Sequence, residues 1–242
     1  GGGSRTPAPI ASSVGAKTVD ETREVLARYR DRGYWVHSVK VGGDVDQNIE
    51  RIQDVETHRP AKERILYDAN RGFTRQQALR VMQATEQWKV MFEQPCETLD
   101  DIAAIRPLHS APVSVDECLV TLQDATRVAR DGIAEVFGIK LNRVGGLTKA
   151  SRIRDIALAH GIDIFVMATG GSVLADTEAL HLAATIPDDN MLGVWACQDM
   201  ITAEIADGAG PRATKGHLHL PEQPGLGVHP QESTLTKVAR YE

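Results

Sequence analysis

The sequence predicts an α/β fold of the (β/α)7β type, in which eight parallel strands close into a barrel. Short apolar runs alternate with longer segments of helical period, a pattern typical of parallel strands joined by crossover helices. Eight such runs lie between residues 10 and 195, the number that closes a TIM-like barrel. No Gly-x-Gly-x-x-Gly follows the first run, which disfavours the nucleotide-binding form of an open sheet.

The predicted strands are short runs of branched or aromatic apolar residues bounded by polar or turn-forming residues. Most begin about one strand-helix unit after the preceding one. In chain order they cover Ile10–Val14, Trp35–Val41, Ile65–Asp68, Val90–Glu93, Val113–Asp116, Val136–Lys140, Ile162–Met167 and Met191–Trp195.

The segments between these strands carry apolar residues three or four positions apart, the period of a helix that covers a sheet with one face. Thr74 stands where a helix N-cap is expected, and Gly33 and Gly161 follow helical runs, where a left-handed cap residue is favoured. The periodic positions are Val19, Thr22, Val25, Leu26 and Tyr29, then Ile49, Ile52 and Val55, then Ala78, Val81 and Met82, and later Ile153, Ile156 and Ala157.

One barrel domain is expected to occupy residues 9–205. Residues 1–8 begin Gly-Gly-Gly-Ser-Arg and are expected to be a linker or the remnant of a preceding domain. After Trp195 the pattern changes, and the stretch from about Ala206 to Pro230 is rich in glycine and proline. We therefore expect the eighth unit to lack a regular helix and residues 206–242 to form an irregular C-terminal tail that packs on the barrel or on a capping domain.

The composition is that of an ordinary globular protein, with 242 residues, 42% hydrophobic and 25% charged, and a net charge of −6. No basic block stands out, so a nucleic-acid partner is not expected. No apolar run approaches the roughly 20 residues of a membrane-spanning helix, so no membrane partner is expected. The cysteines Cys96, Cys118 and Cys197 are odd in number and far apart, which disfavours a disulfide framework and favours a cytoplasmic location.

Five of the predicted strands end on a residue that can carry a charge. These residues are 23 to 28 positions apart, about one strand-helix unit each: Lys40, Asp68, Glu93, Asp116 and Lys140. In a barrel the carboxyl ends of all strands open on one mouth, where the active site lies. We therefore expect the three carboxylates to converge there. The two lysines stand on strands two and six of eight and should face each other across the mouth.

This arrangement predicts a metal-assisted proton transfer. Three anions in one small site need a cation, and hard oxygen ligands suit Mg²⁺ or a similar divalent ion. Such an ion stabilises the enediolate that forms when the α-proton of a carboxylate is removed. A lysine base must be neutral, and a nearby cation and partial burial both lower its pKa. The opposite lysine can return a proton or assist a leaving group.

The motifs around these positions resemble the enolase superfamily, in its mandelate racemase/muconate lactonizing enzyme-like branch. They are Val39-Lys40-Val41-Gly42, Tyr67-Asp68-Ala69-Asn70, Phe92-Glu93-Gln94-Pro95, Val115-Asp116-Glu117 and Lys140-Leu-Asn-Arg-Val-Gly-Gly146. The resemblance runs from about Ala8 to Gly227. It implies that Asp68, Glu93 and Asp116 bind one Mg²⁺ per site and that Lys40 and Lys140 are the acid/base pair. It also implies that Asn70 and Glu117 are hydrogen-bonding groups next to the ligands.

Two departures from the family pattern affect the expected site. The branch usually carries Lys-x-Lys on the second strand, whereas Ser38 stands at the earlier position here. The second cation beside Lys40 is therefore missing, and Ser38 becomes a candidate substrate-binding or supporting residue. The resemblance also implies an N-terminal α+β capping domain, which is expected to be absent from this chain because the chain begins near the first barrel strand.

The eighth strand and the segment after the seventh indicate a small substrate. Dipeptide epimerases of this branch carry Asp-x-Asp on the eighth strand, and the segment from Gly193 to Met200 has no such pair. Trp195 is a candidate to pack on a small ring or a substituted ammonium, or else to cap the barrel core. The segment from Met167 to Ser172 resembles cis-3-hydroxy-L-proline dehydratases and the related proline-betaine epimerases.

We therefore predict a lyase that dehydrates cis-3-hydroxy-L-proline to 1-pyrroline-2-carboxylate. Two lysines on opposite faces serve a racemase or epimerase of proline betaine or another amino acid derivative equally well, so the bases leave both reactions open. A degenerate barrel that binds a small acid without turning it over is the non-enzymatic alternative. The expected partner is a small-molecule carboxylate, and the chain is expected to form a homo-oligomer.

The remaining histidines and cysteines are expected to have no chemical role. The cysteines Cys96 and Cys118 lie two or three residues past a predicted ligand and are expected to pack near the site. Six histidines share no strand-end register and are expected on the surface or as helix caps: His37, His109, His160, His181, His217 and His219.

Overall fold

The computed structural model describes residues 7–170, 172–201, 205–206, 210–234 and 236. Eight parallel strands form a closed ring, in which each strand pairs with the next along the chain and β1 pairs with both β2 and β8. This confirms the predicted barrel. The strands are β1 (Ala8–Val14), β2 (Val36–Lys40), β3 (Arg64–Asp68), β4 (Met91–Glu93), β5 (Val113–Val115), β6 (Val136–Lys140), β7 (Asp163–Met167), β8 (Met191–Trp195) and the short β9 (His217–Leu218).

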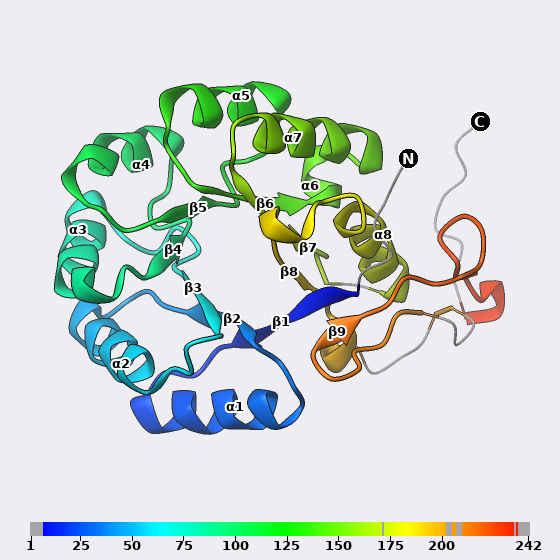
Figure 1. Ribbon diagram of the computed structural model, residues 1–242, viewed down its shortest axis with the longest axis horizontal. Coiled ribbons are helices and arrows are strands. Elements are labelled where there is room, and N and C mark those ends of the chain that lie inside the picture. The colour runs from blue at the N-terminus through cyan, green and yellow to red at the C-terminus, as the bar shows by residue number, and fades with distance from the viewer. Residues whose placement is uncertain (1–6, 171, 202–204, 207–209, 235, 237–242) are drawn as a thin grey trace.

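The helices form a layer outside the ring of strands (Figure 1). Each strand from β1 to β7 is followed by an α-helix, whereas the only helices in the described residues after β8 are short 3₁₀ turns, as predicted. The α-helices are α1 (Val19–Asp31), α2 (Val45–His58), α3 (Arg75–Ala84), α4 (Leu99–Ile105), α5 (Leu122–Asp131), α6 (Leu141–Val144), α7 (Leu147–Ala159) and α8 (Val173–Ala183). The 3₁₀ helices are η1 (Glu86–Trp88), η2 (Arg106–Leu108), η3 (Asp188–Asn190), η4 (Gln198–Met200) and η5 (Glu232–Thr234).

The caps expected from the sequence are present. The Thr74 side chain accepts a hydrogen bond from the Gln77 backbone in a reciprocal capping box at the start of α3. Gly33 and Gly161 adopt left-handed conformations after α1 and α7, with φ of 84° and 66°. These signals fix where each helix leaves the barrel and therefore which residues end the strands.

The C-terminal tail contains β9, which the sequence did not predict. This strand pairs antiparallel with β1 through Ala8 and Leu218, which extends β1 two residues before its predicted start. Further along, Val228 packs with Val173 of α8. Residues 1–6 of the predicted linker lie outside the described residues, as do 202–204 near the predicted end of the barrel domain and 207–209, 235 and 237–242 of the predicted tail.

Alternation along the strands divides the core into two parts. Side chains that point outward pack against the helices in the larger cluster, which contains residues such as Ile10, Val39 and Ile139. Side chains that point inward fill the lumen, among them Val36, Leu66 and Val136. Because successive residues of a strand face opposite sides, a residue two positions past a lumen residue also points into the lumen. Lys40, Asp68 and Lys140 each lie an even number of residues after one of these lumen residues, so their side chains also point into the lumen.

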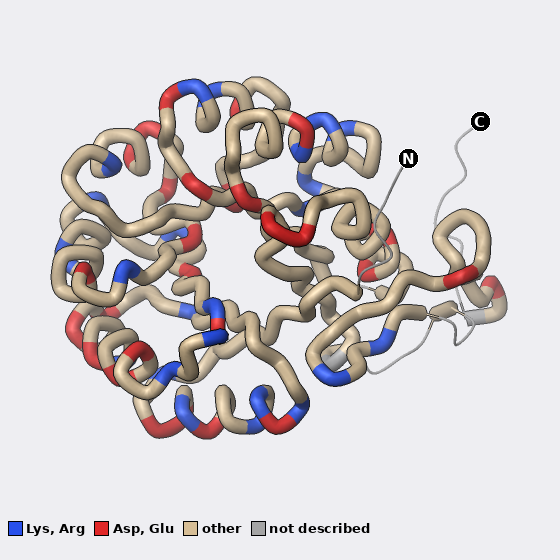
Figure 2. Tube along the Cα trace, viewed as in Figure 1, with Lys and Arg blue, Asp and Glu red and all other residues tan. Residues whose placement is uncertain are grey.

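Both charge signs are present along the outer helices (Figure 2). Ion pairs between neighbouring helices include Arg23 with Asp54 and Arg75 with Asp101. In the described part of the chain, no helix is long and apolar enough to cross a membrane.

His37 lies in the core, so the expectation that it is a surface or capping residue was wrong. Its side chain points outward from β2 and is fully buried between the barrel and the helices. Its Nδ1 lies 2.7 Å from Ser12 Oγ, and its Nε2 lies 3.7 Å from Glu63 Oε1. Glu63 also binds Arg30 of α1 through two hydrogen bonds of 2.6 and 2.9 Å. These polar partners allow an imidazole to occupy an otherwise apolar layer.

This cluster should make stability depend on pH. Burial alone raises the pKa of Glu63, but the hydrogen bonds and charges of His37 and Arg30 outweigh it and lower the pKa to about 2. The stabilisation is therefore present above the unfolded value of 4.5 and is lost as the pH falls towards 2. We expect Glu63→Gln to lower the free energy of unfolding by about 2 kcal/mol at neutral pH. Urea unfolding at neutral pH and near pH 2 should show this difference shrinking in acid.

The control is Glu24→Gln, which changes an exposed residue of α1, the helix that carries Arg30. It should shift stability by less than about 0.5 kcal/mol. An equal effect of Glu63→Gln at both pH values would contradict the assigned ion pair.

Candidate active site

The register of the strands brings the predicted residues to one end of the barrel. Lys40 pairs with Asp68 across β2 and β3, and Asp68 pairs with Glu93 across β3 and β4. Glu93 pairs with Ser114, and Asp116 follows two positions later, just beyond the end of β5. Lys140 ends β6, four strands from β2 in either direction around the ring. Five residues far apart in sequence therefore share one layer, and the two lysines stand on opposite walls.

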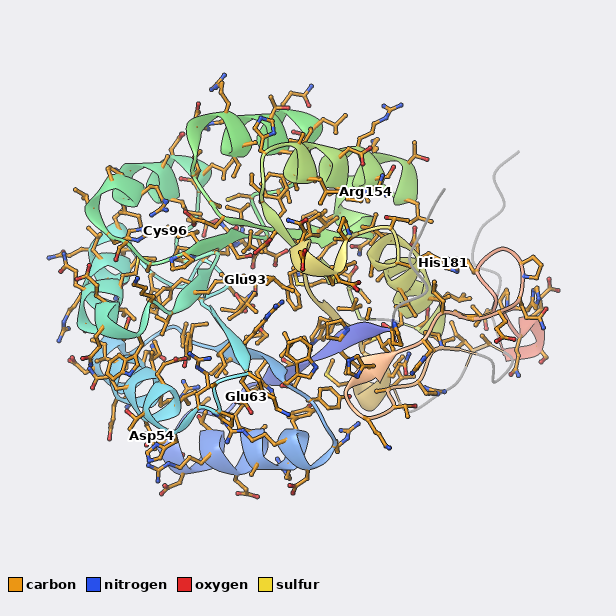
Figure 3. The ribbon with its side chains drawn as sticks, in the orientation of Figure 1. Asp54, Glu63, Glu93, Cys96, Arg154 and His181 are labelled. Carbon is orange, nitrogen blue, oxygen red and sulfur yellow. The ribbon has the colours of Figure 1, made fainter. Side chains whose placement is uncertain are left out.

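A cavity of about 230 Å³ opens at this end of the barrel. Lys40, Asp68 and Lys140 line it together with Ser38 and Trp195. Figure 3 shows Glu93 on the inner side of the ring of strands. Two other cavities, of about 180 and 350 Å³, have walls that include the amino-terminal ends of the strands and none of the strand-end charges.

Lys40 belongs to a hydrogen-bonded group around Asp68. Its Nζ contacts the Asp68 carboxylate and donates to Asn70 Oδ1 at 3.0 Å. The Asn70 backbone N–H donates to Asp68 Oδ1 at 2.8 Å, and Asn70 Nδ2 donates to Glu117 Oε1 at 3.1 Å. Asn70, in a left-handed conformation with φ of 43°, thus holds the ligand candidate, the lysine and Glu117 together.

A second group surrounds Asp116 on the opposite wall. Lys140 Nζ lies 2.7 Å from Asp116 Oδ2, and Arg143 of α6 contacts Asp116 Oδ1. The Asp116 side chain is 1% exposed. Each of its two carboxylate oxygens is therefore shielded from solvent and bound by one cation, Lys140 or Arg143. Sequence reasoning did not single out Arg143, although it stands inside the motif that begins at Lys140.

Glu93 lies between these two groups and has no partner of its own. Both of its carboxylate oxygens are buried without a hydrogen bond within the described residues. Burial, together with the charges of Asp68 and Asp116, raises the pKa of Glu93 well above its ordinary value. An unpaired buried carboxylate beside two others is costly unless a cation joins them. Three carboxylates that offer hard oxygens fit a divalent ion such as Mg²⁺.

The carboxylates do not form a ready-made cage as they stand. Among the described residues, no three His, Cys, Asp or Glu side chains are gathered closely enough to hold a metal ion. Asp68 and Asp116 are bound by Lys40 and Lys140 instead. Burial alone lowers the pKa of Lys40, but the charge of Asp68 outweighs it and the pKa is raised. The sequence led us to expect a lowered pKa for Lys40. The structure instead gives a raised pKa, because the partner of Lys40 is a carboxylate.

Gln94 connects the ends of β4 and β5 and is a second residue that sequence reasoning missed. It is fully buried, with a left-handed φ of 38°. Its Oε1 accepts hydrogen bonds from the backbone N–H groups of Asp116 at 3.0 Å and Cys118 at 3.2 Å. Its Nε2 donates to the Cys96 carbonyl and to Cys118 Sγ. Because Gln94 directly follows Glu93 in the chain, its hydrogen bond to the Asp116 backbone fixes the position of Asp116 relative to Glu93.

Cys96 and Cys118 pack near the site, as expected. Burial raises the pKa of the Cys96 thiol to about 11 and also raises that of Cys118. Neither cysteine is therefore a ready nucleophile.

Gly138 provides the space for Asp116 beneath Lys140. It lies on β6 two residues before Lys140 and therefore faces the lumen. A Cβ at this position would come within 2.7 Å of Met167 Cε, 3.0 Å of the Val115 carbonyl oxygen and 3.3 Å of Asp116 Cβ. The lumen at this level has no room for a side chain on β6.

The other walls of the cavity were not predicted. Phe165 and Met167 of β7 form an apolar side next to Trp195, and Thr169 follows them. Ser13 of β1 lies on the remaining side. The alternation of side chains along each strand could have identified Ser13 and Phe165, because each lies two residues from another residue that faces the lumen, Ala11 or Met167.

Comparison with known proteins agrees with this geometry. Residues 21–234 match the family model described as enolase C-terminal domain-like. A cis-3-hydroxy-L-proline dehydratase from Roseibium aggregatum is 32% identical over 226 residues, which are 91% of this chain and 61% of that protein. The chain therefore spans less than two thirds of the length of this relative. Other relatives, 26 to 30% identical, are named as three synthases, two epimerases, a racemase and a cycloisomerase.

Solved structures show the same fold. A Silicibacter pomeroyi protein assigned to the mandelate racemase/muconate lactonizing enzyme group is 76% identical, with a TM-score of 0.96 over 99% of this chain and 66% of that one. An enolase superfamily member from Roseovarius nubinhibens ISM, complexed with magnesium, is 38% identical, with a TM-score of 0.95 over 100% of this chain and 66% of that one. The barrel and the match of the family model together show that this chain belongs to the enolase superfamily, in its mandelate racemase/muconate lactonizing enzyme-like branch.

Proposed function

We propose that this chain forms the barrel of a Mg²⁺-dependent lyase that dehydrates cis-3-hydroxy-L-proline to 1-pyrroline-2-carboxylate. The supporting observation is that Lys40 and Lys140 line opposite walls of one small cavity. Asp68 lies in the wall of this cavity, and Glu93 and Asp116 lie at the ends of the two strands that follow β3. The similarity to a dehydratase of this substrate, at 32% identity, supports the choice of substrate. Enzymes of this superfamily share proton abstraction next to a carboxylate.

Asp68, Glu93 and Asp116 would hold the Mg²⁺. The unpaired oxygens of Glu93 support this assignment, because they lack a hydrogen bond in the described part of the barrel. When bound, the ion supplies positive charge beside the substrate carboxylate, which makes the α-proton more acidic. Asn70 and Glu117 would hold Asp68 and Lys40 in place.

The two lysines would carry out the proton transfers. In cis-3-hydroxy-L-proline the α-hydrogen and the hydroxyl lie on opposite faces of the ring. The amine on one wall takes the α-proton, and the ammonium on the other wall protonates the departing hydroxyl. The C–H and C–O bonds break, a C–C double bond forms, and water leaves. The resulting enamine then tautomerises to the cyclic imine.

Epimerisation of proline betaine or another amino acid derivative is the alternative. The same opposite lysines support it, because each can exchange a proton with one face of the α-carbon. A barrel that binds small acids without turnover is the non-enzymatic alternative. The predicted homo-oligomer, the cytoplasmic location and the division into residues 1–8, 9–205 and 206–242 stay predictions from the sequence.

The reaction is tested by following the α-proton of candidate substrates in deuterated water. The full-length protein with Mg²⁺ should be incubated with 3- and 4-hydroxyprolines and with their betaines. We expect loss of water from cis-3-hydroxy-L-proline, no turnover after removal of divalent ions with a chelator, and recovery on adding Mg²⁺. Exchange with inversion would instead establish an epimerase. Binding without exchange for every acid would favour the non-enzymatic barrel.

Removal of either lysine should abolish turnover without unfolding the protein. We expect Lys40→Ala and Lys140→Ala each to lower kcat by about a thousandfold, since positioned acids and bases contribute on this scale. The matched control is Lys62→Ala, an exposed lysine in the loop before β3, at the other end of the barrel. It should leave kcat unchanged. Activity that survives in both site variants would contradict the two-base assignment.

Loss of the Gln94 side-chain amide should weaken metal binding. Gln94→Met keeps the volume but removes the acceptor that holds the Asp116 backbone. We expect the calorimetric affinity for Mg²⁺ to fall about tenfold, as is usual when a residue that supports a ligand is changed. Gln94→Glu keeps a carboxyl oxygen at the same place and should retain more of the affinity.

The control for this experiment is Thr85→Val, which removes another buried hydrogen bond at the end of α3. It should lower stability without changing Mg²⁺ affinity. If Gln94→Met bound Mg²⁺ like the parent, Gln94 would have no positioning role.

A further inference from the structure

Two serine residues lie on neighbouring strands in one wall of the cavity. Ser13 of β1 and Ser38 of β2 are register partners in neighbouring parallel strands, and both line the cavity that contains the two lysines. In the described part of the chain, neither hydroxyl has a hydrogen-bond partner. The next residue of β1 behaves differently, because Ser12 points away from the lumen and is bound to His37. Ser13 and Ser38 therefore present unused hydrogen-bonding groups to whatever occupies the cavity.

The walls of the cavity differ in chemistry around the ring. The side formed by β3 to β6 carries the carboxylates and Lys140. The side formed by β7 and β8 is apolar, with Phe165, Met167 and Trp195. Besides Thr169, which follows β7, the neutral polar residues among the described residues that line the cavity are Ser13 of β1 and Ser38 of β2, next to Lys40. A ligand with its carboxylate towards the charges and its ring towards β7 and β8 turns its remaining edge to Ser13 and Ser38.

We propose that Ser13 and Ser38 form a subsite that recognises a neutral hydroxyl group on the ring of the substrate. A serine hydroxyl donates one hydrogen bond and accepts others, as a substrate hydroxyl does, so the two groups are complementary without any charge. A site built to bond a hydroxyl discriminates strongly against an analogue that lacks it, because its polar groups are then left unpaired. This inference rests on the proposed function, since it assumes an amino acid ring in the cavity.

The subsite explains a feature that the family pattern leaves open. Position 38 is a serine, where the resemblance to the family leads us to expect a lysine. A lysine there would fill the space between β1 and β3 with a second ammonium, which a neutral hydroxyl does not require. The small side chains of Ser13 and Ser38 leave room for the substrate edge beside Lys40. That lysine, on the same strand as Ser38, is then the one nearest to the hydroxyl.

The subsite is tested by comparing two ligands that differ only in the hydroxyl. The full-length Lys140→Ala protein, saturated with Mg²⁺, allows binding without turnover. Calorimetry should measure its affinity for cis-3-hydroxy-L-proline and for L-proline. We expect the hydroxylated acid to bind about tenfold more tightly. Adding either Ser38→Ala or Ser13→Ala should lower this preference about fivefold. The affinity for L-proline should change by less than a factor of two.

The matched control is Ser12→Ala in the same Lys140→Ala protein, which removes a neighbouring hydroxyl that faces the helices. It should leave the preference unchanged, and thermal unfolding should show that each variant is folded. Equal binding of the two acids, or equal weakening of both by the Ser13 and Ser38 changes, would overturn the subsite alone. Binding of neither acid by the Lys140→Ala protein would overturn the proposed function together with the subsite.

Discussion

The candidate active-site end of this barrel depends on the register of its parallel strands. A shift of one residue in β3 or β4 would turn Asp68 or Glu93 out of the lumen and into the helix layer, because side chains alternate along a strand. The observed pairing of Lys40, Asp68 and Glu93 holds all three on one level. Closure of the ring then fixes the opposite wall, where Lys140 stands four strands away. Chemistry at the mouth is therefore a property of the sheet rather than of any single loop.

Charge balance is the second constraint on this end of the barrel. Three carboxylates face three cations, and the salt bridges are distributed unevenly among them. Asp116 contacts both Lys140 and Arg143, Asp68 contacts Lys40, and Glu93 contacts neither. Buried carboxylates repel one another unless each finds a positive partner. The middle carboxylate is therefore the one whose environment changes most when a cation joins the group.

The fold and the charged residues could be predicted from the sequence because each depends on a local pattern. Strand-end charges recur at one per unit, and Lys140 and Trp195 end their strands where they were expected. Arg143 and Gln94 could not be assigned roles, since their partners follow another strand, β5. The two-residue β9 is too short to leave a periodic signal. His37 was misplaced because one polar residue in a strand gives no sign of the distant carboxylate that accompanies it.

Gly138 has a consequence for how this barrel can change its substrate. The lumen under Lys140 is already filled by Asp116 and Met167, so β6 cannot contribute a side chain that reshapes the cavity at that level. The carboxylates at the ends of β3 to β5 are equally constrained by their proposed role as Mg²⁺ ligands. A protein engineer who seeks a new specificity in this scaffold is left with the lumen positions of β7, β8 and β1 and with Ser38 of β2. The proposed reactive groups thus constrain one part of the lumen, and the other lumen positions are available for changing selectivity.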